Sequence, residues 1–515
     1  MHSTTVIPWF MAVVVATASV VSANLNTLIP NGPSGNRVDI VFLGDGYTAG
    51  EQINAVYPQH VQAFIDYTFL GNQQPFPRYQ SFFNVHTIDV VSNESGADIP
   101  PDDVFVDTAL NARYYFDNQT ERLLYISNFK ASQIINSALS GTDITAEMKV
   151  VTVNSTKYGG GGGNYAVYAG GNSLATEIAL HEIGHQFADL ADEYVSFSTP
   201  YTGSEPSEAN VTTNPAGKWD LWLGYVDPDF PELGPVGVYE GARYHPTGIY
   251  RPTQNSKMRS LNRPFDAISR EQIIRRIYEL VDPIDTHLPN TGTLIDPGAL
   301  TVEVIDEEVI DLTWSIQGQT VTPLDPSAFD PSLYGYGLGT FEVSALAADN
   351  TPWVRTPEIK DLLSQEVLWT VTLTEPATDL DGTGILDADD IDLAISKLNA
   401  GGGFDLDGSG TADPTDIDFL LAEMIGTAFG DGNLDGRVNL EDLSTFADLF
   451  GQQAYGWSNY DFNLSGVIDL EDLSLLANNW GFNAGQQGTP IPTPATAAPL
   501  ILGFATRHRP QSKAI

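Results

Sequence analysis

Residues 181–194 read HEIGHQFADLADEY. His181 and His185 stand four positions apart, so on a helix they share one face and both imidazoles can reach one zinc ion. Glu182 lies beside them, where its carboxylate can take a proton from a water molecule. Ile178 continues the same stripe one turn earlier, which favours a helix. The segment therefore predicts a zinc-binding helix, and the alternative is a chance match on an ordinary core helix.

A catalytic zinc site takes three protein ligands and keeps one position open. Asp189, Asp192 and Glu193 follow the second histidine closely. On a continuous helix Asp192 would lie about 10 Å further along the axis, so the helix must end near Ala188 and the chain must turn back. We predict Asp192 as the third ligand, with Glu193 or a distant histidine as alternatives. The distant histidines of this region are His60, His86, His245 and His287.

The composition excludes several classes of function. Among 515 residues, 66 are acidic and 23 are basic, which gives a net charge of −43. Nucleic acids and anionic membranes need clusters of Lys and Arg, so we expect neither as a main partner. There is no cysteine, which excludes disulfides, thiolate zinc sites and cysteine nucleophiles. A hydrophobic share of 42% is still enough for a folded chain.

The rest of the chain divides into regions of different pattern. Residues 24–288 alternate expected strands (38–43, 82–91 and 149–153) with expected helices (174–190 and 266–281), a mixed α/β pattern. Residues 289–376 show short alternating apolar runs between turn residues, which predicts a small antiparallel β-sandwich. Five glycines at 159–163 predict a mobile loop beside the site, because no dinucleotide-binding pattern surrounds them.

Residues 377–482 contain four copies of a twelve-residue loop. Oxygen-bearing side chains stand at positions 1, 3, 5, 9 and 12 and glycine at position 6, the spacing of an EF-hand-type calcium loop. We predict that each loop binds Ca²⁺, and the alternative is an acidic, solvated linker. The predicted ligands are Asp379, Asp381, Thr383, Asp387 and Asp390 in the first loop, Asp405, Asp407, Ser409, Asp413 and Asp416 in the second, Asp431, Asn433, Asp435, Asn439 and Asp442 in the third, and Asp461, Asn463, Ser465, Asp469 and Asp472 in the fourth.

The motifs of residues 24–288 resemble the bacterial IgA-metallopeptidase family of zinc peptidases. Residues 181–194 carry that family's hallmark, a zinc helix that runs into Asp-Glu-Tyr. Further matches are Gly44-Asp-Gly-Tyr47, Phe83-Asn-Val85, Ser92-Asn-Glu-Ser-Gly-Ala-Asp98, Tyr239-Glu-Gly-Ala-Arg243, Gly248-Ile-Tyr-Arg-Pro252 and Met258-Arg259. The resemblance covers roughly residues 36–280. It implies a zincin-like α/β (α+β) catalytic domain.

The resemblance also implies the roles of individual residues. It implies that zinc is held by His181, His185 and Asp192. It implies Glu182 as the catalytic acid and base, and Met258 as a Met-turn beneath the metal. Three further side chains are candidates for stabilising the oxyanion of the transition state, namely Tyr250, Arg251 and His245.

The repeats and the two ends of the chain resemble other known elements. The four loops end in Asp, as in type I dockerin repeats, which implies docking to a cohesin-like partner. An apolar run at residues 6–21 followed by small residues predicts a signal peptide at 1–23, hence a secreted or cell-surface protein. The prolines of residues 490–496, a short apolar stretch and a basic cluster at 507–509 resemble a degenerate PEP-CTERM sorting tail. We expect no stable membrane span after processing.

The predicted protein is thus multidomain. Its parts are a signal peptide (1–23), a zinc metallopeptidase domain (24–288), a β-sandwich (289–376), α-helical EF-hand-like calcium repeats (377–482) and a linker with a sorting-type tail (483–515). We predict a secreted zinc endopeptidase that acts on protein or peptide substrates. The alternatives are a non-catalytic, calcium-stabilised surface binding or docking protein that retains a zinc site, and a zinc hydrolase of a non-protein amide. Glu182 argues against the binding protein, because a retired enzyme could lose it without unfolding.

Overall fold

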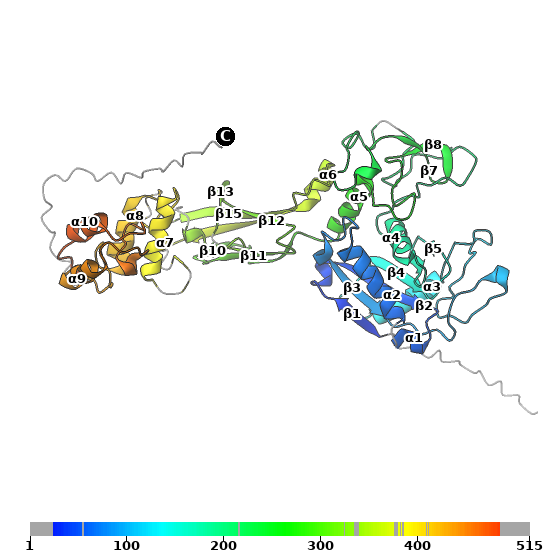
Figure 1. Ribbon diagram of the computed structural model, residues 1–515, viewed down its shortest axis with the longest axis horizontal. Helices are drawn as coiled ribbons and strands as arrows, with labels where there is room; N and C mark the ends of the chain where they lie inside the picture. The colour runs from blue at the N-terminus through cyan, green and yellow to red at the C-terminus, as the bar shows by residue number, and fades with distance from the viewer. Residues whose placement is uncertain are drawn as a thin grey trace, which may run out of the picture. The chain divides into compact units, whose positions relative to one another are not determined.

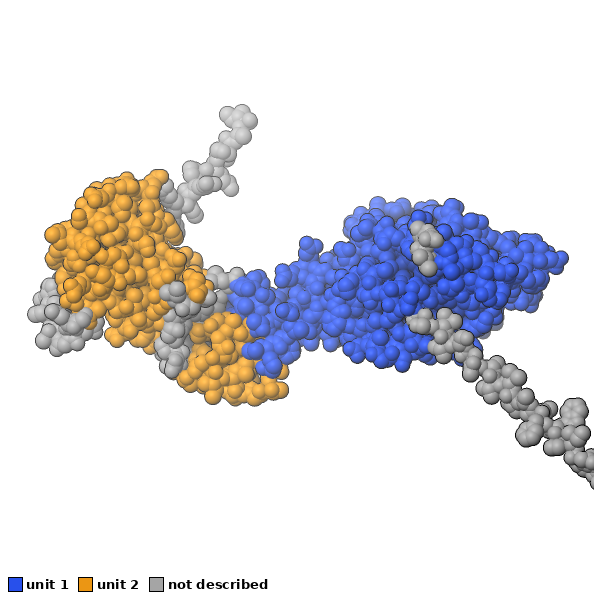
Figure 2. Space-filling view, turned by 90° about the horizontal axis from the view of Figure 1, so that it is seen from below, with its two compact units in different colours: residues 1–289, 301–329, 344–368 blue, residues 290–300, 330–343, 369–515 orange. Residues whose placement is uncertain are grey.

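The computed structural model describes residues 24–484 except 54–55, 215–216, 324, 334–338, 375–379, 382, 384–385, 408 and 410. The predicted signal peptide, most of the predicted tail and the first predicted calcium ligand, Asp379, lie outside the described residues. Contacts divide the chain into two compact units, coloured separately in Figure 2. The first comprises residues 1–289, 301–329 and 344–368, and the second comprises residues 290–300, 330–343 and 369–515.

A six-stranded sheet forms the centre of the first unit, with the strand order β1-β3-β2-β4-β6-β5 (Figure 1). The four inner strands are parallel, and the edge strands β1 and β5 are antiparallel to their neighbours. β2 is buried along its whole length, as expected for a central parallel strand with both faces covered. The strands are β1 (Leu25–Ile29), β2 (Val38–Asp45), β3 (Phe83–Ile88), β4 (Met148–Val153), β5 (Gly160–Gly161) and β6 (Ala166–Ala169).

Helices cover both faces of this sheet. Val41 and Leu43 of β2 share a buried cluster with Ile135 of α3. Phe42, between them, faces the opposite side, where its ring packs against Phe64 of α2 at 5.2 Å. Helix α4 contacts α2, β4 and β6, so it lies on the α2 side. The helices of this unit are α1 (Ala49–Ile53), α2 (Val56–Ile65), α3 (Asn128–Ala138), α4 (Ala175–Gln186), α5 (Ala267–Tyr278) and α6 (Pro357–Lys360).

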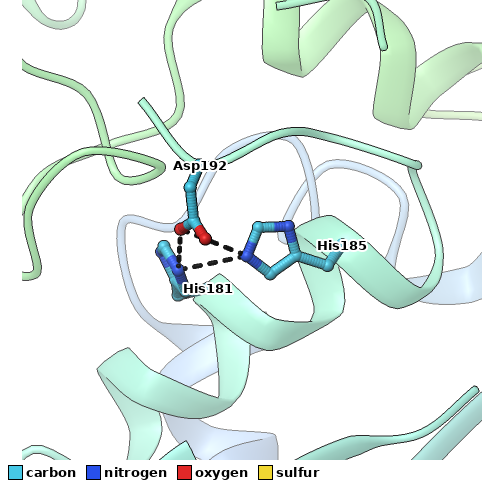
Figure 3. A group of neighbouring side chains, drawn as sticks. All are labelled: His181, His185 and Asp192. Atoms are coloured by element: carbon cyan, nitrogen blue, oxygen red, sulfur yellow. Dashed lines mark hydrogen bonds and ion pairs between the residues drawn. The ribbon is translucent and has the colours of Figure 1, made fainter. Parts of the chain in front are cut away.

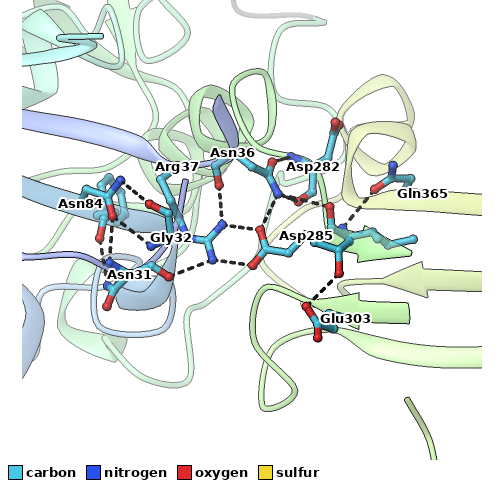
Figure 4. A network of polar contacts seen from close by, with 12 residues as sticks. Asn31, Gly32, Asn36, Arg37, Asn84, Asp282, Asp285, Glu303 and Gln365 are labelled. Atoms are coloured by element: carbon cyan, nitrogen blue, oxygen red, sulfur yellow. Dashed lines mark hydrogen bonds and ion pairs between the residues drawn. The ribbon is translucent and has the colours of Figure 1, made fainter. Parts of the chain in front are cut away.

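A buried polar network joins the start of β2 to strand β9 (Ile284–His287) (Figure 4). Arg37 is 3% exposed and donates to both carboxylate oxygens of Asp285, each at 2.6 Å. Asn36 donates to the same carboxylate at 2.8 Å. A buried guanidinium is costly to leave without its partner, so this pairing fixes β9 against the large sheet.

Three smaller sheets follow. β7 (Tyr239–Ala242) and β8 (His245–Arg251) form an antiparallel pair, and β14 (Ala328–Phe329), β11 (Leu300–Val304) and β9 form a three-stranded sheet. The third sheet has the order β10-β16-β15-β12-β13. Its strands are β10 (Thr293–Ile295), β12 (Asp311–Ile316), β13 (Gln319–Val321), β15 (Gly339–Ala348) and β16 (Ser364–Leu373). β10 is parallel to β16, which differs from the all-antiparallel expectation because alternation identifies a strand but not its partner's direction.

Four helices dominate the second unit, α7 (Ala388–Asn399), α8 (Pro414–Phe419), α9 (Leu440–Leu449) and α10 (Leu470–Asn478). Each begins with a capping box, in which the N-cap side chain and the acid three residues later bond to each other's backbone N–H groups. The N-caps are Asp387, Asp413, Asn439 and Asp469, and their partners are Asp390, Asp416, Asp442 and Asp472. These are positions 9 and 12 of the four repeated loops, so each loop leads directly into a helix.

Candidate metal centre and active-site cleft

Helix α4 carries both histidines of the motif and ends just after them. Asp189 adopts a left-handed conformation with a φ of 52°. Leu190 then donates its N–H to the carbonyl of Gly184 at 2.9 Å. A left-handed residue at this position closes a helix and reverses the chain. The helix therefore ends near Ala188, as expected, and the reversal returns Asp192 to the histidines.

Three side chains converge at this point (Figure 3). Nε2 of His181 lies 3.0 Å from Oδ1 of Asp192. Nε2 of His185 lies 3.4 Å from the same oxygen and 3.3 Å from the other Nε2. The two imidazoles therefore present their Nε2 atoms, together with one carboxylate oxygen, to a common point.

The remaining nitrogen of each imidazole is occupied by a backbone carbonyl. Nδ1 of His181 lies 3.0 Å from the carbonyl oxygen of Lys257, and Nδ1 of His185 lies 2.5 Å from that of Leu190. A carbonyl can only accept, so both Nδ1 atoms carry a proton, and in the neutral imidazole this leaves Nε2 as the nitrogen with the lone pair that a metal ion can bind. This is the arrangement that orients histidines for metal binding.

Burial and charge shift the pKa values of this site. Burial alone would lower the pKa of His185, but its hydrogen bond and charge interaction with Asp192 outweigh burial and raise that pKa to about 9. Burial alone would raise the pKa of Asp192, but its bonds to the two histidines hold it below the ordinary value. Burial raises the pKa of Glu182, and the histidine charges oppose that rise. Asp192 is thus held as an anion, as a metal ligand should be.

The alternative third ligands lie elsewhere. Glu193 is completely buried and accepts hydrogen bonds from Ser256 at 2.6 Å and Asn210 at 3.0 Å. Burial and the nearby charge of Asp266 raise its pKa to about 8. The four distant histidines have other partners, which are Tyr47 for His60, Asp39 for His86, Thr199 for His245 and Leu288 for His287.

Met258 lies beneath the turn of α4 that carries the histidines. It is fully buried, and a Cβ at Gly184 would come within 2.7 Å of its Sδ. Glycine therefore permits the close contact between helix and methionine. The adjacent Lys257 is also fully buried, and its Nζ pairs with Glu177 of α4 at 2.7 Å. This ion pair holds the loop whose carbonyl orients His181.

The glycine run borders the site on another side. A Cβ at Gly160 would lie 2.8 Å from Oε1 of Glu182, and one at Gly162 would lie 2.8 Å from Cβ of His185. Only a backbone without side chains can pass this close. Gly160 and Gly161 form strand β5, so this part of the predicted loop is paired into the sheet.

The three candidates for oxyanion stabilisation lie in strand β8. Arg251 is buried and donates to the backbone carbonyl of Glu240 at 2.8 Å. Nδ1 of His245 lies 2.9 Å from the carbonyl oxygen of Thr199. Tyr250 packs against a cluster of buried tryptophans. None of these three side chains is among the residues that line the cleft, although the ring of His245 packs at 5.1 Å against Phe197, which does line it.

A cleft of about 640 Å³ opens over Glu182 and the histidines, and residues without a predicted role also line it. Tyr244 donates its hydroxyl to Oδ2 of Asp192 at 2.5 Å, on the side away from the histidines. The ring of Tyr194 packs edge-on against Tyr244 at 5.2 Å, and its hydroxyl accepts from Arg122 at 3.0 Å. Tyr194 ends the histidine motif and Tyr244 follows a quoted match, but Arg122 carries no sequence signal.

The metal centre, the glycine run and the Met258 loop fall within one part of the chain that matches a known family. The profile of the family described as IgA Peptidase M64 matches residues 27–233 and 226–277. This chain belongs to the IgA peptidase M64 family. The resemblance predicted from the motifs is thereby confirmed. No curated protein gives a significant match to the chain.

Membership of the M64 family makes this chain a metallopeptidase, which acts on proteins or peptides. Two groups of described side chains lie close enough together to hold a metal ion. The group of His181, His185 and Asp192 lies within the M64 match, and the group of Asp405, Asp407 and Asp416 lies in the second repeated loop. In the described part of the chain, no helix is long and apolar enough to cross a membrane.

Proposed function

We propose that this M64 peptidase is an exported zinc endopeptidase that hydrolyses peptide bonds of proteins. In this proposal His181, His185 and Asp192 hold the zinc ion. Glu182 is the catalytic acid and base. The observation that carries the proposal is the convergence of the two imidazole Nε2 atoms and one carboxylate oxygen beside a buried glutamate.

The donor atoms fit zinc in type and in spacing. Zinc in proteins is bound tetrahedrally at about 2.0–2.1 Å by nitrogen and oxygen, which places neighbouring ligand atoms about 3.3 Å apart. The three separations here are 3.0, 3.3 and 3.4 Å. Two imidazoles and one carboxylate also leave a fourth position open, as a catalytic site requires.

The side chains divide the work of hydrolysis between them. A bound zinc ion would lower the pKa of a water molecule and polarise the scissile carbonyl. Glu182 accepts the proton that the water gives up and later delivers it to the leaving nitrogen. Its burial raises its pKa towards the range in which a carboxyl can both take and return a proton. Tyr244 holds Asp192 in place, and the carbonyls on both Nδ1 atoms keep the imidazoles from rotating.

Metal removal tests this proposal directly. The full chain should cleave an unfolded generic protein, lose that activity on treatment with a zinc chelator, and regain it with one equivalent of zinc. Gel electrophoresis of the substrate and zinc content per chain give the readout. Cleavage that persists after the zinc has been removed would contradict the proposal. A zinc-loaded chain that leaves proteins intact would instead favour the non-catalytic binding protein or the hydrolase of a non-protein amide.

We also propose that the repeated loops bind Ca²⁺. Residues 376–487 hold 21 acidic residues and two basic ones, so their charges repel one another in the absence of a cation. The first and last acids of the third and fourth loops, Asp431, Asp442, Asp461 and Asp472, are completely buried. Burial raises the pKa of Asp431, and the charge of Asp442 raises it further. A hard cation with six to eight oxygen ligands would relieve both costs. Docking to a cohesin-like partner remains a prediction from resemblance.

Calcium should stabilise the second unit. Trp457 is buried there and donates its ring N–H to the carbonyl of Asp431 at 2.7 Å, so its fluorescence reports on unfolding. Each site that binds only the folded state should add about 2.7 kcal/mol when free Ca²⁺ is 100 times its Kd. Thermal unfolding with Ca²⁺ or EGTA measures this gain. Asp442→Asn should reduce it, and Asp448→Asn, at an exposed position, should not. Unfolding that is the same with and without Ca²⁺ would refute the proposal.

A further inference from the structure

A second, smaller cavity of about 220 Å³ adjoins the metal centre. We call it the arginine pocket, and its lining includes Arg122, Arg259, His181, Glu182, Tyr194 and Ser260. It shares His181 and Glu182 with the larger cleft, but neither His185 nor Asp192 lines it. The pocket therefore lies to one side of the catalytic glutamate, where a substrate residue next to the scissile bond would enter.

The charge of this pocket is unusual for so acidic a chain. Two arginines line it, and the only acid in its lining is Glu182. The larger cleft, by contrast, is lined by Asp117, Asp189, Glu182 and Asp192, with Arg122 as its one basic side chain apart from histidines. In a chain with a net charge of −43, a site that places two guanidinium groups beside one carboxylate selects for negative charge.

Both guanidinium groups retain hydrogen-bonding capacity. Arg122 donates to the hydroxyl of Tyr194 at 3.0 Å, and Arg259 donates to the backbone carbonyl of Gln254. These acceptors are uncharged, and no carboxylate of the described residues forms an ion pair with either arginine. A guanidinium carries five N–H donors in a planar fork that matches a carboxylate.

The two arginines are attached to the same elements that build the metal centre. The carbonyl of Arg122 accepts the N–H of Gly160 at 3.1 Å, which fixes it beside strand β5. Its guanidinium stacks over the ring of Tyr194 at 5.2 Å. Arg259 directly follows Met258, and its N–H bonds to the carbonyl of Ser256 at 3.0 Å. Groups held this way are pre-organised, so a ligand pays little ordering entropy.

We propose that the arginine pocket is a specificity subsite, in which Arg122 and Arg259 bind a carboxylate of the substrate next to the scissile bond. The inference rests on the proposed peptidase function and adds a substrate class to it. The carboxylate is either an Asp or Glu side chain, which gives the proposed endopeptidase an acidic specificity, or the C-terminal carboxylate of a peptide, which would make the chain a zinc exopeptidase in place of the proposed endopeptidase.

Cleavage-site mapping distinguishes the two sources. The full zinc-loaded chain digests an unfolded protein, and mass spectrometry reads the products. Asp and Glu should be enriched at one fixed position beside the cleaved bond if side chains bind. Short peptides released from the C-terminus, and protection by C-terminal amidation, are expected if the terminal carboxylate binds. Cleavage with neither preference would overturn the proposal while leaving the peptidase function intact.

Binding measurements keep the proposal testable if no cleavage is seen. Two pairs of alanine peptides serve as probes. In the first pair both ends are blocked, and one peptide carries a Glu where the other carries a Gln. In the second pair one peptide has a free C-terminal carboxylate and the other a C-terminal amide. In each pair we expect the peptide with the carboxylate to bind at least about tenfold more tightly than the neutral peptide, because the neutral peptide cannot form charge-assisted bidentate bonds with the arginines. Equal binding within both pairs would overturn the subsite.

Substitutions identify the groups responsible. The Arg122→Gln/Arg259→Gln double variant should lose the preference for the carboxylate form of a peptide over its neutral form but keep its zinc. Arg263→Gln removes one charge from an exposed position in the same loop and should keep the full preference. A preference that survives in the double variant would contradict the assignment.

Discussion

Glu182→Gln is expected to slow peptide hydrolysis by about 10²- to 10⁴-fold, the range that a positioned general acid and base contributes. Gln has the same shape, so it fits between α4 and the glycine run, where a Cβ at Gly160 would already lie 2.8 Å from Oε1. It cannot accept a proton from water or return one to the leaving nitrogen. The three metal-binding atoms are untouched, so zinc content should stay at one per chain. The measurements are kcat on an unfolded protein and zinc per chain.

Asp189→Asn is the matched control for this variant. Asp189 also lines the cleft, but its role is to close helix α4 with a φ of 52°. Asn tolerates a left-handed conformation about as well as Asp, so the fold should be preserved. The control should keep most of its activity. If the two variants lose activity equally, the cleft depends on its overall negative charge, and the role given to Glu182 is wrong.

The candidate metal centre could be predicted from sequence as far as its geometry is local. The four-residue spacing of the histidines and the glutamate between them are properties of one helix. The rule of helical rise also required a break before Asp192 could return. The left-handed conformation of Asp189 and the hydrogen bond from the Leu190 N–H to the Gly184 carbonyl decide which carboxylate lies next to the histidines. The spacing of the residues in the sequence could not distinguish Asp192 from Glu193.

Met258 was predicted through its motif, but two residues that reach the site from other distant segments were not predicted. Arg122 arrives because its carbonyl pairs with Gly160, and Tyr244 arrives because the chain that follows β7 passes over Asp192. Neither belongs to a local pattern. Arg251 is the opposite case, because it belongs to a matched motif but its guanidinium donates to backbone carbonyls within the β7–β8 hairpin. A motif match therefore does not tell whether a residue supports the fold or lies in the cleft.

In the repeated loops, positions predicted to bind calcium also cap the helices that follow. Position 9 caps the following helix and position 12 bonds back to it, as Asp413 and Asp416 do at α8. The same two positions belong to the predicted calcium ligands. Capping alone does not require oxygen-bearing side chains at positions 1, 3 and 5, such as Asp405, Asp407 and Ser409, so the full set still favours the proposed cation site. The sequence could thus predict each loop, whereas the burial of the first and last acids of the second, third and fourth loops needed the structure.

Asp192→Asn should lower the affinity for zinc by more than about 100-fold. The loss of a residue that only hydrogen-bonds to a metal ligand already lowers metal affinity by about 10- to 100-fold, and a direct ligand should matter more. The substitution keeps the size of the side chain and its contact with Tyr244. It removes the negative charge that faces both Nε2 atoms and that holds the pKa of His185 at about 9. Competition with a chromophoric chelator measures the affinity. Peptidase activity should fall in parallel at limiting zinc and recover partly at high zinc.

Glu193→Gln is the matched control, one residue further along the chain. Burial and the charge of Asp266 raise the pKa of Glu193 to about 8, so at neutral pH this carboxyl is largely protonated and a poor ligand. Gln can keep the contacts with Ser256 and Asn210 while adding no charge, so zinc affinity should stay close to that of the unaltered chain. The reverse result, in which Glu193→Gln loses zinc and Asp192→Asn keeps it, would move the third ligand to Glu193. Loss in neither variant would point to a histidine that the structure places away from the cleft.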